Sequence, residues 1–455
     1  MIKSSLYLRI LNIFSNNNIL THLNYILFIY FFSSILYFYE INATDETKNA
    51  NDFFQNTLLE KFTQNNDSRI VNYPQSNITN LTNNNEDSIY GQIEAFDNNV
   101  YVVWQESVTE SLPEHNYDIF FIKSEDNGKT FGTPTNLSNN TEFSERPQIA
   151  VSKNGIFIVW AETTSPNNKE IMFTKSLDNG KTFSNPINLS NNSKDSYNQE
   201  ISAFKENVYV IWQDRDKKNN NTNGIIMFRS SINTGNTFNN SIELINNTTD
   251  DSFPKINSYG NYVYIVWNNE NKKNNGLFFV KSFDKGNNFD NITKLSNDNN
   301  FGESQIAVNE NEILVIWGGF LLKNIENIYY VKSNDNGKTF TDAKTISEKI
   351  IRSNNTNYYT ELNEIIQKPM NVEVTKKNFS YIVWQNSFSE QNEDILLLVD
   401  NHKDNSHTNL VNLSNNSGIS ECPSIAISDN NLYVIWEDYT AGNHEILLAN
   451  LLIGR

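Results

Sequence analysis

Short apolar runs recur along most of the chain, and each of them ends in a tryptophan. They have the form VYVVW or IFIVW, and their tryptophans are separated by 56, 52, 55, 50, 67 and 52 residues. The tryptophans are Trp104, Trp160, Trp212, Trp267, Trp317, Trp384 and Trp436. Because these are all seven tryptophans of the chain, the pattern indicates a sequence repeat rather than a bias of composition.

Each repeat carries four segments rich in β-branched and aromatic residues, separated by Asn, Gly and Asp, which is the pattern of β-strands. A short segment such as 148–151 precedes the tryptophan run, and an apolar run such as 118–122 follows it. A weaker fourth segment ends in Asn-Leu-Ser, as at 136–138. The second and third segments are apolar on both faces, which is typical of a sheet covered on both sides. Seven four-stranded antiparallel sheets of this kind predict an all-β, seven-bladed β-propeller.

The two ends of the repeat region complement each other. The last unit has no fourth segment after 445–453, whereas residues 77–81 supply an isolated fourth segment before the first unit. Pairing the two would close the ring and remove an exposed sheet edge. The sequence therefore predicts one propeller domain over residues 76–455.

The first 43 residues differ from the rest of the chain. Lys3 and Arg9 precede an uncharged run at 25–39, YILFIYFFSSILYFY, and acidic residues follow it. This order indicates a signal peptide or a membrane anchor, with the N-terminus inside and the remainder outside the membrane. Residues 44–75 are polar and without a period, as in a linker. We expect an extracytoplasmic protein, secreted or anchored, that meets a membrane only through its N-terminal segment.

Composition narrows the possible partners. The formal charge of −18 argues against nucleic acid, whose binding draws on clustered Lys and Arg. The single cysteine, Cys422, excludes an internal disulfide and a multi-cysteine metal site. The five histidines show no metal-ligand spacing and are interpreted as solvated loop residues. We expect no metal and no cofactor, and a monomer, although no motif determines the oligomeric state.

Five units carry an octapeptide of the type SEDNGKTF between their third and fourth segments. The octapeptides begin at Ser124, Ser176, Ser231, Ser282 and Ser333. They resemble the Asp-box, or BNR, repeat of the sialidase-like propellers, and the resemblance covers roughly residues 77–455. That family implies six blades, so a six-bladed ring is the alternative. Asn233 and Asn288 depart from the pattern, and the last two units have no clear octapeptide.

A structural role accounts for the octapeptide. Its carboxylate can accept hydrogen bonds from turn amides, and its glycine can adopt a positive φ. We interpret the following residues as structural rather than as ligands of calcium: Asp126, Gly128, Asp178, Gly180, Gly235, Asp284, Gly286, Asp335 and Gly337.

Strand order places the loops after the tryptophan runs and the connections between units on the rim opposite the octapeptides. This rim is predicted to bind a ligand, because propellers usually bind there and it gathers carboxylates. They are Glu106, Glu145, Glu162, Glu200, Asp214, Glu303, Glu421, Glu437 and Asp438.

If this chain were a working sialidase-like enzyme, the resemblance would imply three arginines around the substrate carboxylate. It would also imply a Tyr nucleophile paired with Glu, and an Asp acid/base. Guanidinium groups suit a carboxylate because they bind it with two parallel hydrogen bonds. The candidates are Arg146, Arg215 and Arg352, with Tyr358, Tyr359 and Glu361 as a possible nucleophile pair. Their spacing is unconvincing, and an acidic rim would repel an anionic sugar.

The leading hypothesis is a non-catalytic recognition propeller for a glycan, a peptide or a cation. The alternatives are a glycoside hydrolase, of the sialidase type or acting on a neutral glycan through paired carboxylates, and a structural cell-surface component.

Glycosylation sequons recur along the chain, and an exported chain could be modified at exposed ones. They include Asn77, Asn80, Asn136, Asn139, Asn188, Asn191, Asn246, Asn291, Asn378 and Asn412. Because Asn-Leu-Ser is itself part of the repeat, the same residues could serve structure instead.

Overall fold

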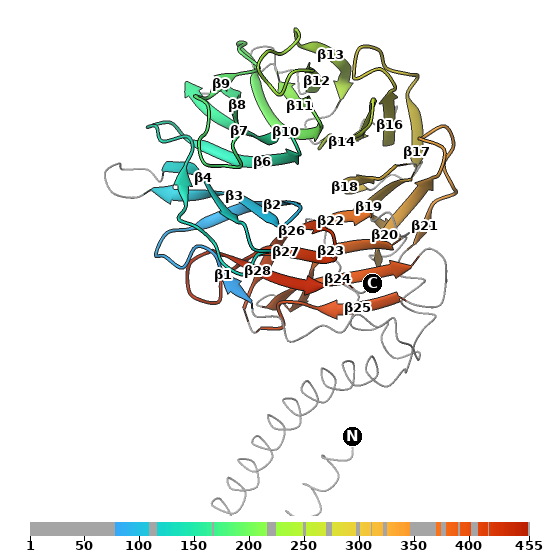
Figure 1. Cartoon of the computed structure of the whole chain (residues 1–455). Helices are drawn as coiled ribbons and strands as arrows, with labels where there is room; N and C mark the ends of the chain where they lie inside the picture. The colour runs from blue at the N-terminus through green and yellow to red at the C-terminus, as the bar shows by residue number, and fades with distance from the viewer. Residues whose placement is uncertain are drawn as a thin grey trace, which may run out of the picture. The chain divides into compact units, whose positions relative to one another are not determined.

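The chain forms a ring of seven four-stranded antiparallel sheets, shown in Figure 1. The computed structural model describes residues 78–453 except 109–115, 166–167, 216–223, 249–251, 270–274, 297–300, 311, 322–324, 346–369, 375–378, 390–391, 402–407 and 417. The seven-bladed β-propeller predicted from the repeat is confirmed, and the six-bladed alternative is wrong.

Six blades are continuous in sequence. The first contains β2 (Ser88–Phe96), β3 (Asn99–Val108), β4 (Asn116–Ser124) and β5 (Thr135–Asn136). The second contains β6 (Ser144–Ser152), β7 (Gly155–Ser165), β8 (Asn168–Ser176) and β9 (Ile187–Asn188). The third contains β10 (Asp195–Phe204), β11 (Asn207–Arg215), β12 (Gly224–Ser231) and β13 (Ile242–Thr248). The fourth contains β14 (Lys255–Tyr259), β15 (Tyr262–Asn269), β16 (Gly276–Ser282) and β17 (Thr293–Ser296). The fifth contains β18 (Phe301–Val308), β19 (Ile313–Leu321), β20 (Ile325–Ser333) and β21 (Lys344–Thr345). The sixth contains β22 (Met370–Val374), β23 (Phe379–Ser389), β24 (Asn392–Asn401) and β25 (Thr408–Asn412).

The seventh blade joins the two ends of the described chain. It contains β26 (Ser420–Ser428), β27 (Asn431–Asp438), β28 (Glu445–Leu452) and, as its outer strand, β1 (Thr79–Asn80). Thr79 pairs with Leu448 and Asn80 pairs with Leu447. The ring closure expected between residues 77–81 and 445–453 is therefore confirmed.

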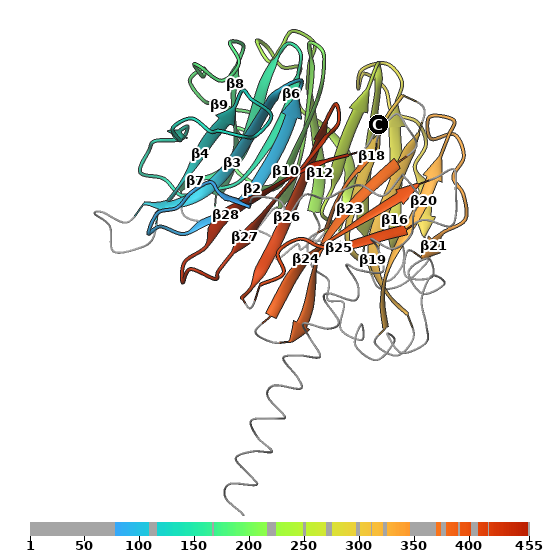
Figure 2. The same cartoon turned by 60° about the horizontal axis from the view of Figure 1, so that its bottom comes forward.

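The hydrophobic core lies between the blades. Neighbouring blades stand face to face around the ring, which Figure 2 shows in an oblique view. All seven tryptophans are buried, and Trp104, Trp160, Trp212 and Trp317 have no exposed surface. One cluster, for example, packs Phe157 and Phe173 of the second blade against Trp212 of the third. Strands apolar on both faces are needed for this arrangement, because each sheet contacts two neighbours.

The first strands of neighbouring blades lie side by side around the centre, so that residues distant in sequence meet there. The predicted segments 1–43 and 44–75 lie outside the described residues. In the part of the chain that the structure describes, no helix is long and apolar enough to span a membrane.

Candidate functional site

The loops of the blades gather on two opposite rims. On one rim, the octapeptides lie beside the turns between first and second strands, and the backbone N–H of Asn127 donates to the carbonyl of Asn98 at 2.8 Å. On the other rim, the connections between blades meet the residues that follow the tryptophans, and Asn84 Nδ2 donates to Glu106 Oε2 at 3.1 Å. We refer to these as the octapeptide rim and the connector rim.

The octapeptide carboxylate holds its own turn together. Asp126 Oδ1 accepts hydrogen bonds from the backbone N–H groups of Lys129 and Thr130 at 3.0 and 2.9 Å, and Oδ2 accepts one from the Thr130 hydroxyl at 2.7 Å. These bonds hold the pKa of Asp126 well below its ordinary value. Asp178 and Asp335 repeat the arrangement, and Asp284 uses Asn288 in place of the threonine.

The octapeptide glycine allows close contact with the preceding blade. Gly180 has a φ of 74°, and a Cβ there would lie 2.9 Å from Cζ of Phe121. Phe183 packs edge-on against the same Phe121 ring, with centroids 4.9 Å apart. Gly128, Gly235, Gly286 and Gly337 also have positive φ. The octapeptide glycine and phenylalanine therefore contact the preceding blade closely.

Five of the nine carboxylates predicted for the connector rim are buried, and four of these five are bound within their own blades. Asp214, 1% exposed, accepts hydrogen bonds from Trp212 Nε1 at 2.7 Å, Ser196 Oγ at 2.7 Å and Asn192 Nδ2 at 3.0 Å. The same three donor types surround Glu106, Glu162 and Asp438. These carboxylates act inside the protein rather than facing a ligand.

The other five carboxylates, Glu145, Glu200, Glu303, Glu421 and Glu437, lie nearer the centre of the connector rim. Glu145 pairs with Lys169 and Glu200 pairs with Lys255. Burial lowers the pKa of Lys255, but the charges of Glu200 and Glu303 outweigh it and leave that pKa raised. The centre of this rim is therefore lined by paired charges of both signs.

A bulge in the first strands presents side chains at this centre. Equivalent residues with positive φ occupy it in four blades: Tyr90, Arg146, Asn198 and Cys422, with φ between 51° and 55°. Arg146 Cζ lies 4.8 Å from the centroid of the Tyr90 ring, and its Nη2 lies 3.5 Å from the Tyr90 hydroxyl. Among the described residues Arg146 forms no ion pair, and it is exposed. An exposed guanidinium on an aromatic ring can bind a polar ligand.

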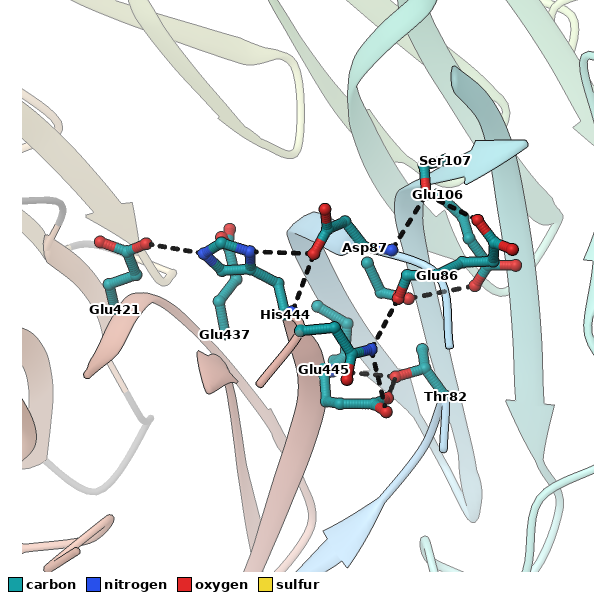
Figure 3. Close-up of polar contacts among 12 residues, drawn as sticks. Thr82, Glu86, Asp87, Glu106, Ser107, Glu421, Glu437, His444 and Glu445 are labelled. Atoms are coloured by element: carbon teal, nitrogen blue, oxygen red, sulfur yellow. Dashed lines mark hydrogen bonds and ion pairs between the residues drawn. The ribbon is translucent and has the colours of Figure 1, made fainter. Parts of the chain in front are cut away.

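His444 links the seventh blade to the first. Its Nδ1 lies 3.2 Å from Asp87 Oδ1, and its Nε2 lies 3.6 Å from Glu421 Oε1. Figure 3 shows the imidazole between these two carboxylates, with Glu437 beside it. The ion pair with Glu421, together with the hydrogen bond to Asp87, raises the pKa of His444 to about 9. The imidazole is therefore charged at neutral pH and fixes both carboxylates.

Glu437 is the most enclosed acid of this group. It is 3% exposed, and its Oε1 accepts a 2.6 Å hydrogen bond from the backbone N–H of Tyr90. Burial raises its pKa to about 8, and the nearby charge of Glu421 adds to the effect. Glu437 is therefore predominantly protonated at neutral pH, whereas its neighbour Glu421 is held by a charged imidazole.

An aromatic ring completes the group. Tyr439 is 44% exposed, and its ring centroid lies 4.8 Å from that of His444. Asp87, Glu421 and His444 are themselves partly exposed. We refer to Asp87, Glu421, His444 and Tyr439 as the seam site, because it lies where the ring closes.

The predicted catalytic residues are not brought together in the described part of the chain. Arg146 contacts Tyr90, whereas Arg215 pairs with Asp195 at 3.2 Å and lies over Tyr197. The remaining candidates, Arg352, Tyr358, Tyr359 and Glu361, lie outside the described residues. No group of three or more His, Cys, Asp and Glu side chains is arranged to hold a metal ion in the described ranges.

Sequence analysis missed most of the seam site. His444 was expected to be a solvated loop residue, which is wrong, because Asp87 of the connection before β2 and Glu421 of β26 hold it. Asp87 and Tyr439 belong to no motif of the repeat, so the sequence does not distinguish them. Tyr90 could have been found, because it aligns with Arg146 and Cys422 in the repeat.

No protein-family model and no curated protein matches the chain. The octapeptides therefore stay a resemblance to Asp-box repeats.

Solved structures similar to this chain include a protein of unknown function from Dyadobacter fermentans DSM 18053, at 14% identity and a TM-score of 0.49, covering 83% of this chain and 99% of that one. The intramolecular trans-sialidase from Ruminococcus gnavus is similar at 12% identity and a TM-score of 0.45, over 83% and 97%. A mutant Trypanosoma rangeli sialidase is similar at 11% identity and a TM-score of 0.48, over 83% of this chain but 59% of that one. Similarities this distant carry no activity over to this chain.

Proposed function

We propose that this chain is an exported recognition propeller, secreted or held by its N-terminal segment, that binds a glycan at the seam site without cleaving it. The observation that carries the proposal is the position of His444 between Asp87 and Glu421 beside the exposed ring of Tyr439. Glycan recognition needs such a combination of polar groups held in place and an apolar face.

The chemistry of the seam site suits hydroxyl groups better than a cation. A cationic ligand would be attracted by two carboxylates, but the charged imidazole of His444 already neutralises part of their charge. The same imidazole lies against the Tyr439 ring, where a cation would otherwise bind. Carboxylate oxygens that are fixed and partly exposed remain good acceptors for sugar hydroxyls.

Arg146 and Tyr90 extend the surface available to such a ligand. Tyr90 is joined to the seventh blade through the hydrogen bond from its backbone N–H to Glu437. The exposed Arg146 guanidinium rests on the Tyr90 ring and can donate to ring oxygens or hydroxyls. This pair would contribute contacts on the side of the seam that belongs to the first and second blades.

The described residues around the seam site favour binding without catalysis. Tyr90, a described tyrosine beside the seam site, does not have the lowered phenol pKa that a nucleophile would need, because burial raises it. Arg215 is paired with Asp195, which leaves Arg146 as the exposed guanidinium near the centre among the described arginines. These features favour binding over the three-arginine chemistry that the Asp-box resemblance implies.

A glycoside hydrolase is the second candidate, favoured by the different states of Glu437 and Glu421. A protonated acid beside an ionised carboxylate is the pair that such enzymes use. Against it, Glu437 is buried and its Oε1 is bound to the Tyr90 backbone, so a substrate could reach it only after that contact opened.

The proposal is tested by measuring binding of the full chain to a panel of neutral and acidic glycans. Tyr439→Ala and His444→Gln should each weaken binding about tenfold or more, since each removes a contact or a charge that orients one. Asn334→Ala, an exposed substitution on the octapeptide rim, is the matched control and should bind as the unmodified chain does.

Turnover of fluorogenic glycosides is followed in the same samples. If the unmodified chain hydrolyses a glycoside and Glu437→Gln does not, the recognition proposal is wrong and the chain is a glycoside hydrolase. Glycan binding that survives both seam-site substitutions would show that the ligand binds elsewhere.

A further inference from the structure

Three consecutive blades expose a large apolar side chain at the same point of the octapeptide. The second residue of the octapeptide is Leu177, Ile232 or Phe283 in the second, third and fourth blades, exposed by 54%, 58% and 56%. The same position holds Glu125 in the first blade and Asn334 in the fifth. Three consecutive blades therefore carry an exposed apolar side chain at this position, where a contact surface is indicated. Leu452, 58% exposed at the end of the third strand of the seventh blade, is a further exposed apolar side chain on this rim.

The repeat places these three side chains at one level. Because they occupy one position of a repeated turn, each projects from its blade at an equivalent height along the ring axis. Three separate apolar side chains at the same level along the ring axis suit contact with a flat, deformable surface such as a lipid bilayer. A folded protein partner would instead need a continuous patch with complementary shape.

Charge on the turns beside these apolar side chains agrees with a lipid interface. Lys153, Lys181 and Lys205 are exposed on the octapeptide rim of the second and third blades. The octapeptide carboxylate Asp178 is bonded to its own turn, and Glu206 follows Lys205 on the turn of the third blade. Although the chain as a whole is acidic, this part of its surface combines apolar side chains with cations, as interfacial membrane contacts do.

The direction of β1 connects this rim to the N-terminal segment. Thr79 and Asn80 pair with Leu448 and Leu447 as Thr135 and Asn136 of β5 pair with Phe121 and Phe120. A fourth strand runs from the octapeptide rim towards the connector rim, so the chain enters the propeller from the octapeptide rim.

Ile78, 42% exposed, lies at that entry point. The predicted apolar segment at 25–39 ends 39 residues before it (78 − 39 = 39). If residues 40–77 behaved as a random coil, they would span about 35 Å on average, which is short enough to hold the rim near a membrane that the segment enters.

We propose that the octapeptide rim of the second to fourth blades lies on a lipid bilayer, with Leu177, Ile232 and Phe283 inserted among the headgroups. The connector rim, with its seam site, then faces away from the membrane. This orientation rests on the predicted N-terminal segment but not on the proposed glycan binding, which uses the opposite rim.

The experiment uses the full chain in vesicles of phosphatidylcholine and phosphatidylglycerol. An environment-sensitive fluorophore is attached at Phe283→Cys in a Cys422→Ser background, and in a matched sample at Asn334→Cys, the same octapeptide position in the fifth blade. Flotation reports whether the chain is on the vesicles, and quenchers placed in the lipid report insertion.

The expected result is a blue shift and lipid quenching at residue 283, neither of them at residue 334, and loss of both at residue 283 when Leu177 and Ile232 are changed to Ser. A chain that floats without any shift at residue 283 would overturn the proposal, as would a chain that does not float at all. A shift that appears without vesicles and grows with protein concentration would also overturn it, because a second copy would then cover the rim.

Discussion

The indole nitrogen of Trp212 donates a 2.7 Å hydrogen bond to Oδ1 of Asp214, two residues further along the same strand. The carboxylate is buried and also binds Ser196 at the start of the blade and Asn192 in the preceding connection. The Asp214 carboxylate thereby holds together the tryptophan strand, the start of the first strand and the preceding connection. Three further blades repeat this arrangement, which explains why an acid so often follows the tryptophan and an Asn-Asn pair so often precedes the blade.

Replacing this carboxylate should destabilise the whole propeller. Asp214→Ala leaves the Trp212, Ser196 and Asn192 donors buried without their acceptor, and we expect a loss of at least about 2 kcal/mol in the free energy of unfolding. Urea denaturation followed by tryptophan fluorescence measures it. Asp342→Ala, at an exposed site, should change stability by less than about 0.5 kcal/mol. Equal effects of the two substitutions would contradict the role assigned to Asp214.

The third octapeptide offers a test by gain of stability. Asn233 Oδ1 already accepts from the Thr237 N–H at 3.0 Å, so Asn233→Asp would restore the carboxylate found in other units. We expect a higher urea midpoint at pH 7.

The gain from Asn233→Asp should depend on pH in a defined direction. The turn lowers the folded-state pKa of octapeptide aspartates, so their contribution is complete above the unfolded value of about 3.9 and is lost as the pH falls below it. A gain that persists unchanged at pH 3 would show that the charge is not its cause.

The contribution of the seam residues to the free energy of unfolding should decrease as the pH rises. His444 has a folded pKa raised to about 9, so its contribution is complete below its unfolded value of about 6.5 and is lost as the pH rises through 9. Glu437, raised to about 8, acts in the same direction between about pH 4.5 and 8, because the folded state holds its proton more tightly. The groups facing them are Asp87, Glu421 and Cys422.

Thermal unfolding between pH 5 and 10 separates the two groups. Glu437→Gln should remove the fall between pH 5 and 8, and His444→Gln should remove the fall above pH 7. Curves for both variants that run parallel to that of the unmodified chain would exclude the seam as the source of the pH dependence.

The recurrent sequons give a further prediction. Asn136 Nδ2 donates at 2.6 Å to Oδ2 of Asp118, which is 4% exposed, and Asn412 donates in the same way to Asp394. Asn136→Ala should cost about 2 kcal/mol, as expected for a hydrogen bond to a buried charge, whereas Glu142→Ala at an exposed position of the same connection should cost little. Peptide mapping of the exported chain should find Asn136 and Asn412 without a glycan, and occupancy at either would refute this assignment.

The repeat in the sequence was sufficient for the blade count, the strand order and the ring closure. Each of these depends on local periodicity and on the order of segments along the chain, both of which the sequence contains directly. The octapeptide could be interpreted for the same reason, since Asp126 and its hydrogen-bond donors lie within four residues of one another.

Only the tertiary structure decided which carboxylates lie inside the protein and which lie on its surface. Glu437 and Asp438 are adjacent on a strand covered on both sides, so no polar face distinguishes them in the sequence. Asp438 binds Trp436 within its blade, whereas Glu437 faces Tyr90 across the seam. The seam site likewise depends on closure of the ring, because Asp87 and His444 are 357 residues apart and meet only when the last blade receives the first strand.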